Sequence, residues 1–206
     1  MRSKHTLTTG LASALVIASA LIFGAAPSAA TRGRALHSPH AAPPAAVTDP
    51  QIAAIVVAAN TVDIEAGKLA QSKTRNAKVK QFADTMVTDH TAVNKAAVEL
   101  VTKLGVTPEE SETSRGLTAS GEQTRARLSG LSGKEFDAEY IANEVAYHRL
   151  VIEAVDKTLI PNAQNAELKA TLVGVRPALV AHLEHAEQLQ AELAGKKPGK
   201  KGAHKH

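Results

Sequence analysis

The chain contains no cysteine and no tryptophan, and it has only three phenylalanines and two tyrosines among its 206 residues. Without cysteine there is no disulfide, no thiolate metal ligand and no site at which a lipid could be attached through sulfur. With so few aromatic side chains, leucine, isoleucine, valine and alanine must fill any core. A folded domain of this composition must be held together by aliphatic packing or by a bound ligand.

Recognisable enzyme motifs are absent as well. The sequence has no Gly-x-Ser-x-Gly nucleophile elbow, no glycine-rich phosphate-binding loop and no cysteine motif. An ordinary hydrolase, kinase or thiol oxidoreductase therefore has no support in the sequence, which favours a protein without enzymatic turnover.

The amino terminus has the pattern of an export signal. Residues 1–30 begin with Arg2 and Lys4, continue with an apolar run at 11–26 and end in small residues before Thr31. The apolar run is shorter than the roughly 20 residues that span a bilayer. We therefore expect a cleaved signal peptide, no transmembrane anchor after cleavage, and an exported protein in the periplasm, in the cell envelope or secreted.

Two further segments flank the folded part. Residues 31–47 are rich in alanine and proline without periodicity, which predicts a flexible spacer. Residues 195–206 form a basic tail with five lysines, predicted to be disordered. Residues 31–194 carry 17 basic and 20 acidic side chains, so the basicity of the chain belongs to its ends and predicts no specific nucleic-acid binding. The tail is either merely solvated or attracted to an anionic cell-envelope polymer or lipid.

Residues 48–194 have the periodicity of a helical domain. Apolar residues recur at alternating steps of three and four, which is one face of an amphipathic helix. This pattern occurs four times and predicts helices at about 49–73, 79–104, 132–159 and 166–193.

Helix-end signals support these boundaries. Asp49 is a candidate N-cap and is followed by Pro50 at the first helical position, where a missing N–H costs nothing. Ser132 and Glu135 have the spacing of a capping box at the start of the third helix. Pro177 lies inside the fourth helix and should bend it.

The connections define the topology. Helices one and two, and helices three and four, are joined by a few residues each, which predicts two antiparallel hairpins. The 27 residues at 105–131 separate the hairpins and include a possible short helix starting near Ser120, whose spacing to Gln123 also fits a capping box. Two hairpins with one long crossover predict an all-α, ferritin-like four-helix bundle.

Side chains that can bind a metal interrupt the apolar stripes. His90, for example, stands between Met86 and Val93, where the second helix should carry an apolar residue. A lone buried charge is costly, so several such residues indicate a shared network. The helix lengths, together with the lean of helical side chains toward the N-terminus, permit one common level. The candidates are Glu65, His90, Glu144, His148 and His182.

Two interpretations of this set remain open. Three imidazoles with Glu65 or Glu144 are typical of a histidine-rich site for a Zn, Cu or Fe ion. A metal-free polar network that fixes the helix register would place the same residues in the core. The first interpretation predicts metal binding, and the second predicts a structural or cell-envelope interaction module with the Lys-rich tail as its contact surface.

Three neighbours of these candidates receive separate predictions. Asp89 lies about 100° around the helix from His90 and is predicted to be solvated or to contact a ligand residue. Tyr140 is predicted to be a core residue with its hydroxyl in the polar network. His185 lies one turn beyond His182, where it could be a further ligand, and is predicted to lie on the surface instead.

Four stretches carry a resemblance to a known family: EAGKLAQSK with Glu65, VKQFADTMVTDH with Asp89 and His90, FDAEYIANEVAYH with Asp137, Tyr140 and His148, and PALVAHLEHA with His182. The chain resembles the exported bacterial ferritin-like proteins that contain a domain of unknown function and are often labelled outer membrane proteins. The resemblance covers most of residues 49–193. It implies the fold and export, and it implies no particular activity.

The motif of ferritin-like di-iron enzymes is incomplete in this chain. Those enzymes place Glu three residues before His on two helices. Here Val87 precedes His90 and Leu179 precedes His182 at that spacing. A ferroxidase or oxygen-activating centre is therefore not expected.

Overall fold

A computed structural model of the chain describes residues 46–195. The predicted signal peptide (1–30), most of the spacer (31–47) and all but the first residue of the tail (195–206) lie outside the described residues. Within residues 46–195, no helix combines the length and apolar character that a membrane crossing requires. The described part contains the helices α1 (Asp49–Lys73), α2 (Ala77–Lys103), α3 (Glu112–Ser129), α4 (Gly133–Ala154), the π-helical segment η1 (Val155–Leu159), α5 (Ile160–Asn162) and α6 (Ala166–Leu193).

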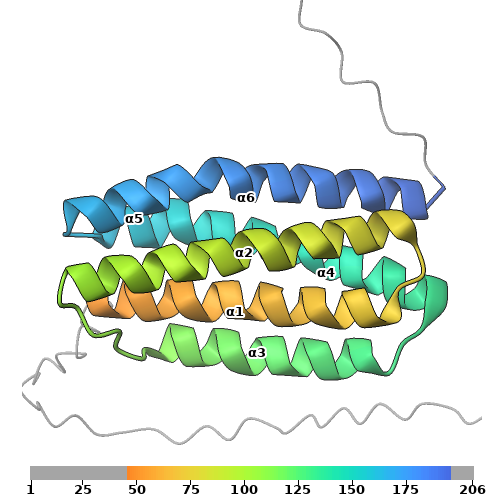
Figure 1. The fold of residues 1–206 in the computed structure, drawn as a ribbon, viewed down its shortest axis with the longest axis horizontal. Coiled ribbons are helices and arrows are strands. Elements are labelled where there is room, and N and C mark those ends of the chain that lie inside the picture. The colour runs from red at the N-terminus through yellow and green to blue at the C-terminus, as the bar shows by residue number, and fades with distance from the viewer. Residues whose placement is uncertain (1–45, 196–206) are drawn as a thin grey trace, which may run out of the picture. The chain divides into compact units, whose positions relative to one another are not determined.

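The helices form two antiparallel hairpins, α1 with α2 and α4 with α6 (Figure 1). The hairpins pack through contacts of α1 with α4 and of α2 with α6. No strand occurs in residues 46–195. The predicted fold class, an all-α bundle of two hairpins joined by a long crossover, is confirmed. α6 is continuous through Pro177 and is curved in Figure 1.

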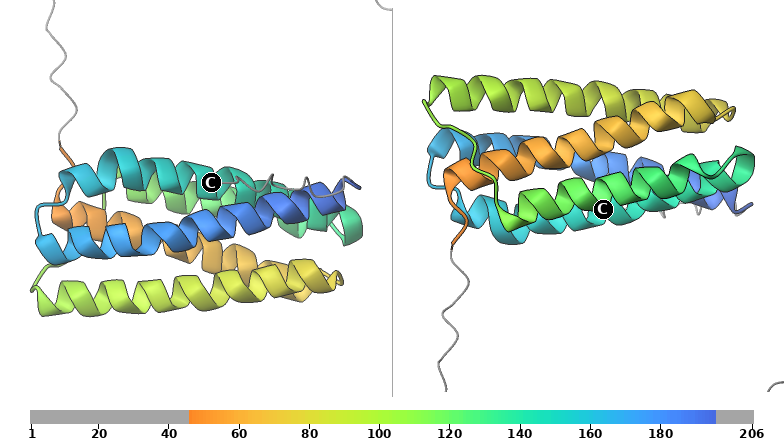
Figure 2. Two further views of the ribbon diagram at one scale, coloured as in Figure 1. Left: turned by 90° about the horizontal axis from the view of Figure 1, so that it is seen from above. Right: turned by 90° about the horizontal axis from the view of Figure 1, so that it is seen from below.

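The crossover differs from its prediction because it contains a full helix, α3, rather than a short one near Ser120. α3 begins after the N-cap Ser111, whose side chain accepts a hydrogen bond from the Ser114 amide, while the Ser114 hydroxyl accepts one from the Ser111 amide. It runs alongside α1, as Figure 2 shows from below. Gly121 allows this close packing, because a Cβ there would lie 2.6 Å from Val62 Cγ2. The prediction failed because α3 is polar and buries few side chains.

Two predicted helix caps are also corrected. Thr48, rather than Asp49, is the N-cap of α1, because Thr48 forms a reciprocal capping box with Gln51. The Asp49 carboxylate instead accepts hydrogen bonds from the backbone amides of Gln164 and Asn165 and so ties α1 to the start of α6.

The predicted capping box of the third helix is not formed. Ser132 is the N-cap of α4, but its side chain makes no capping hydrogen bond. Gly133 directly after it has a φ of +56°, a left-handed conformation that changes the path by which the chain enters the helix. The spacing of Ser132 and Glu135 therefore did not suffice to predict the cap.

The apolar interior is divided into two cores. The aromatic core lies near the α1–α2 turn, where the ring of Tyr140 stacks on Phe136 and meets Phe82 edge-on. Its buried members are Ala66, Ala70, Val79, Phe82, Ala83, Met86, Leu128, Phe136, Tyr140, Ile141, Val145, Ala186 and Leu189. The aliphatic core lies toward the α4–α6 connection. Its buried members are Ile52, Ile55, Val155, Leu159, Ala163, Leu168, Leu172 and Leu179.

Candidate metal centre

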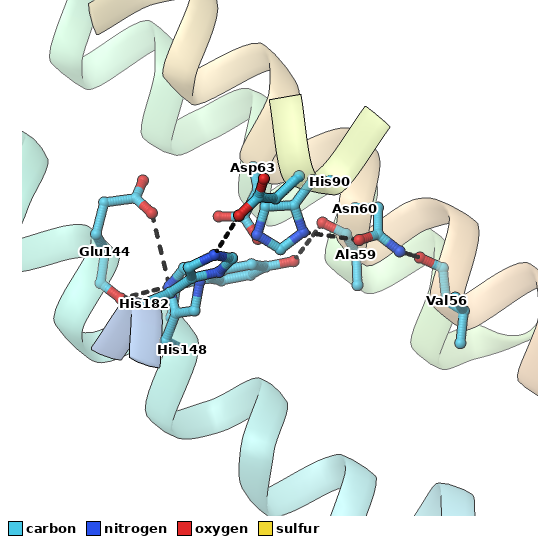
Figure 3. A network of polar contacts seen from close by, with 10 residues as sticks. Val56, Ala59, Asn60, Asp63, His90, Glu144, His148 and His182 are labelled. Carbon is cyan, nitrogen blue, oxygen red and sulfur yellow. Dashed lines mark hydrogen bonds and ion pairs between the residues drawn. The ribbon is translucent and has the colours of Figure 1, made fainter. Parts of the chain in front are cut away.

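A layer of polar side chains separates the two cores. His90 from α2, His148 from α4 and His182 from α6 have exposed fractions of 3%, 0% and 7%. Their ring centroids lie 5.3–5.7 Å apart, and one nitrogen of each ring lies within 4.8 Å of the other two. Figure 3 shows the three rings beside Asp63 and Glu144. The structure thus brings four of the five candidate residues, His90, Glu144, His148 and His182, into one buried region.

Glu65 was wrongly predicted to face this region. Its side chain is 39% exposed and pairs with Lys68 at 2.9 Å and with Arg125 of α3 at 3.3 Å. Asp63 occupies the interior position instead, with Oδ2 3.4 Å from His90 Nε2.

The error has a physical cause in the packing of α1. The apolar residues of α1 at steps of three and four, from which the buried face was predicted, include Val62, and Val62 packs against α3 at Gly121. The face of α1 that lies toward the histidines carries Asn60 and Asp63. Because these residues are polar, the apolar periodicity did not identify this face as buried. Recognising α3 as a full helix would have shown that α1 is covered on more than one side, so that a wider arc of it is buried.

The orientation of His90 is set by Asn60. Asn60 Nδ2 donates to the carbonyl of Val56 at 2.8 Å, so Asn60 Oδ1 faces His90 Nδ1 at 2.7 Å. An amide oxygen can only accept a hydrogen bond, and the Nδ1 of His90 must therefore carry the proton. His90 Nε2 is left with a free lone pair and has no hydrogen-bond partner.

The other two histidines are oriented in the same manner. His148 Nδ1 donates to the Glu144 carbonyl at 3.0 Å, which leaves the lone pair on Nε2. His182 Nε2 donates to Asp89 Oδ2 at 2.9 Å, which leaves the lone pair on Nδ1. Neither lone-pair nitrogen has a hydrogen-bond partner. Asp89 therefore contacts a candidate ligand residue, one of its two predicted roles.

Burial keeps the imidazoles of His90 and His148 neutral. It lowers the pKa of His90 to about 3, with smaller contributions from the charges of His148 and His182. Burial likewise lowers the pKa of His148 to about 4. Neutral imidazole is the form that binds metals.

Two carboxyl groups lie against the histidines. Oxygens of Asp63 and Glu144 and a nitrogen of His148 all lie within 4.8 Å of one another. Burial raises the pKa of Glu144 to about 8 and raises that of Asp63 well above its usual range. Glu144 Oε2 lies 3.6 Å from His148 Nδ1, and neither oxygen of Glu144 makes a hydrogen bond. The layer thus offers two overlapping sets of metal-binding atoms that share His148.

Tyr140 and His185 do not extend this layer. Tyr140 lies in the aromatic core, as predicted, but its buried hydroxyl has no hydrogen-bond partner, so its predicted place in the polar network is wrong. His185 is half-buried and packs edge-on against Phe82, with ring centroids 5.2 Å apart.

The distances between the histidine nitrogens are compatible with one metal ion if the imidazole rings move slightly toward one another. A tetrahedral ion with bonds of about 2.0–2.1 Å to nitrogen places its ligand atoms about 3.4 Å apart. The nitrogens here lie within 4.8 Å of one another. Side-chain rotations that move these nitrogens by about 1 Å would bring them to the distances that a tetrahedral ion requires.

The chain is therefore an all-α bundle with a buried histidine and carboxyl cluster. Residues 35–189 match the family described as "Domain of unknown function (DUF4142)", and because the match spans most of the chain, the protein belongs to this family. No curated protein matches the chain. A crystal structure from Streptomyces coelicolor, described as "putative secreted protein DUF305", is similar, with a TM-score of 0.61 and 14% identity over 72% of this chain and 94% of that one. At this identity the likeness extends to the fold alone.

Proposed function

We propose that the protein is an exported helical-bundle protein that binds a Zn, Cu or Fe ion between its helices. The ligands are His90 Nε2, His148 Nε2 and His182 Nδ1, with a carboxylate from Asp63 or Glu144. One observation carries the proposal: three buried imidazoles from three helices each bring a ring nitrogen within 4.8 Å of the other two, and each ring has a nitrogen without a hydrogen-bond partner.

The partners of the other three nitrogens support a metal site. Histidines that bind metals usually donate their second ring N–H to a carbonyl or carboxylate, which fixes the tautomer. Here the acceptors are the Asn60 side-chain oxygen, the Glu144 carbonyl and the Asp89 carboxylate. Each leaves the inner nitrogen unprotonated, as metal binding requires.

A metal-free network is the alternative, and the number of donors weighs against it. Three buried ring nitrogens, one on each histidine, receive no hydrogen bond from the described residues. The nearby carboxyls contact the rings at His90 Nε2, 3.4 Å from Asp63 Oδ2, and at His148 Nδ1, 3.6 Å from Glu144 Oε2. An unsatisfied buried polar atom costs about 1–3 kcal/mol. A single cation satisfies all three nitrogens.

Export and envelope association complete the proposal. The export-signal pattern in the sequence and the description of the similar Streptomyces coelicolor protein support export to the periplasm, the cell envelope or the medium. The ferritin-like relationship rests on the order of the hairpins and the crossover. The lysines of residues 195–206 would attract an anionic envelope polymer, and without a bound metal the protein would be a structural or envelope-interaction module.

Metal-dependent stability tests the leading function. The full mature protein, made without an affinity tag, is stripped with a chelator and titrated with Zn²⁺, Cu²⁺ or Fe²⁺ at neutral pH. A metal that binds only the folded state adds about 2.7 kcal/mol at a hundredfold excess over its dissociation constant. We expect this gain in the natural protein and no gain in His148→Ala or His182→Ala. Elemental analysis of the protein as purified identifies the metal.

His185→Ala is the matched control, because His185 lies on the same helix as His182 but outside the cluster. This variant should keep the full metal response. An equal melting temperature with and without every metal would refute the metal site and leave the polar network. A response that survives both His148→Ala and His182→Ala would place the metal elsewhere.

A further inference from the structure

A cavity of about 460 Å³ adjoins the histidine layer on the side of the aliphatic core. Its walls come from α1, α2, α3, α4, η1 and α6, and most of its lining is alanine, valine, leucine and isoleucine. The lining side chains that carry a carboxyl, amide or imidazole group are Asn60, Asp63, Asp89, His90 and His182, at the end next to the histidine layer, and three threonines, Thr113, Thr158 and Thr171, are the other polar lining residues. The cavity therefore has a long apolar part and a short polar end.

The cavity follows from the side chains that the sequence supplies. Ala53, Ala59 and Ala97 line it from α1 and α2, and no aromatic ring other than those of His90 and His182 belongs to its lining. Alanine fills little of the space between helices. The volume falls within the range of about 300–1,000 Å³ that is usual for small-molecule sites.

The cavity is open to a ligand from solvent. Ala92 of α2, Ala178 of α6 and Leu150 of α4 line it and are exposed, and Asp89 beside the histidines is 46% exposed. The bundle therefore does not enclose the cavity completely.

We infer that this cavity binds a neutral amphiphile with a single hydrocarbon chain and an uncharged hydroxyl head. The chain lies along the aliphatic core, and the head contacts His90 and His182, which each have a buried nitrogen without a hydrogen-bond partner. A charged head of either sign would have to leave water for a buried site and is disfavoured. An anionic head would also meet the carboxyl groups of Asp63 and Asp89.

The proposed head site shares His90 and His182 with the proposed metal site, whereas the apolar part of the cavity is independent of the metal ligands. His148 belongs to the proposed ligand set but does not line the cavity. His148→Ala should therefore lose the metal response and keep amphiphile binding, whereas a variant that fills the cavity should do the reverse.

Calorimetric titration of the chelated full-length mature protein with 1-hexanol, 1-octanol and 1-decanol tests the inference. Each added methylene that enters the cavity should tighten binding about fourfold, at a stoichiometry of one per chain. Decanoate and decylammonium should bind at least tenfold more weakly than decanol. Binding without saturation, or without dependence on chain length, would overturn the site, and equal affinity for the charged chains would overturn the assignment of a neutral head.

A pair of neighbouring alanines on α2 provides the matched variants. Ala97 lines the cavity and is 8% exposed, whereas Ala96 is exposed and does not line it. Ala97→Leu should weaken decanol binding at least tenfold and keep the metal response, while Ala96→Leu should leave both unchanged. An equal decanol affinity in the two folded variants would overturn the inference.

Discussion

The aromatic core and the aliphatic core are built from the same long helices but are filled differently. Phe82, Met86, Phe136 and Tyr140 are completely buried in the aromatic core. The aliphatic core lacks such large side chains and borders a cavity of about 460 Å³. Three of the four phenylalanine and tyrosine side chains of residues 46–195 thus pack in one half of the bundle, Tyr147 meets His148 edge-on at the histidine layer, and the other half contains the cavity.

The histidine layer lies at the boundary and has a different environment on each side. Toward the aromatic core, Glu144 and His148 are completely buried. Toward the cavity, His182 is slightly exposed and bonds to the half-exposed Asp89. The side toward the aromatic core therefore holds the ligand residues in place, and the side toward the cavity is the one that is partly exposed.

Two isoleucine substitutions should show the largest difference between the cores. Ile141 is completely buried in the aromatic core, and Ile55 lines the cavity. Ile141→Ala should reduce the free energy of unfolding by about 4 kcal/mol, because it opens a new void. Ile55→Ala should cost only about 2 kcal/mol, because that side chain already borders empty space.

Urea unfolding of both variants and of the natural protein measures this difference. Helix content by circular dichroism serves as the control for an unchanged fold. If the two substitutions cost the same, the cavity is filled or collapsed in solution and the contrast between the cores is wrong.

The helices and the histidines could be predicted because both depend on local pattern. The steps of three and four placed His90, His148 and His182 on buried faces without knowledge of the neighbouring helices. The short connections then made the hairpins predictable. Each of these inferences needs only the helical period and the reach of the chain.

Asp63, α3 and the cavity could not be predicted in this way. Periodicity identifies an apolar face, and on α1 the apolar position Val62 meets α3, while the polar residues Asn60 and Asp63 face the site. α3 itself was concealed by a polar composition, and its N-cap pair Ser111 and Ser114 lacks the usual Glu or Gln. A cavity depends on how side-chain volumes combine across several helices, and sequence pattern does not report this.

A second pair of substitutions, both on α1, tests which acidic residue of this helix belongs to the histidine layer between the cores. Asp63→Asn removes a buried carboxyl group beside His90 at nearly constant volume, and it should weaken metal binding by about 10–100-fold. Glu65→Gln should leave metal affinity unchanged, because Glu65 faces Arg125 and solvent. Titration of each chelated variant with the metal found in the natural protein measures both effects.

The opposite result would restore the original prediction from the sequence. A loss of affinity in Glu65→Gln without a loss in Asp63→Asn would mean that α1 is rotated relative to this structure. Stability to urea separates the two causes of weak binding, because Glu65→Gln removes only partly exposed ion pairs, worth at most about 1 kcal/mol.

The smallest expected effects come from adding one methyl group in each half of the bundle. Gly67 of α1 is buried among aromatic-core residues, and a Cβ there would lie 2.8 Å from Val87 Cγ2 and 3.2 Å from the Ala83 carbonyl oxygen. Gly67→Ala should therefore lower the free energy of unfolding by about 1 kcal/mol, because overpacking outweighs the better helix propensity of alanine. Gly174 of α6 lies in the other half with no atom within 4 Å of its Cβ position, and Gly174→Ala should raise the free energy of unfolding by about 0.5–1 kcal/mol. Thermal and urea unfolding would measure the sign of the change in the free energy of unfolding for each variant. An increase for Gly67→Ala would mean that the aromatic core is less tightly packed than the contacts of Phe82, Phe136 and Tyr140 indicate.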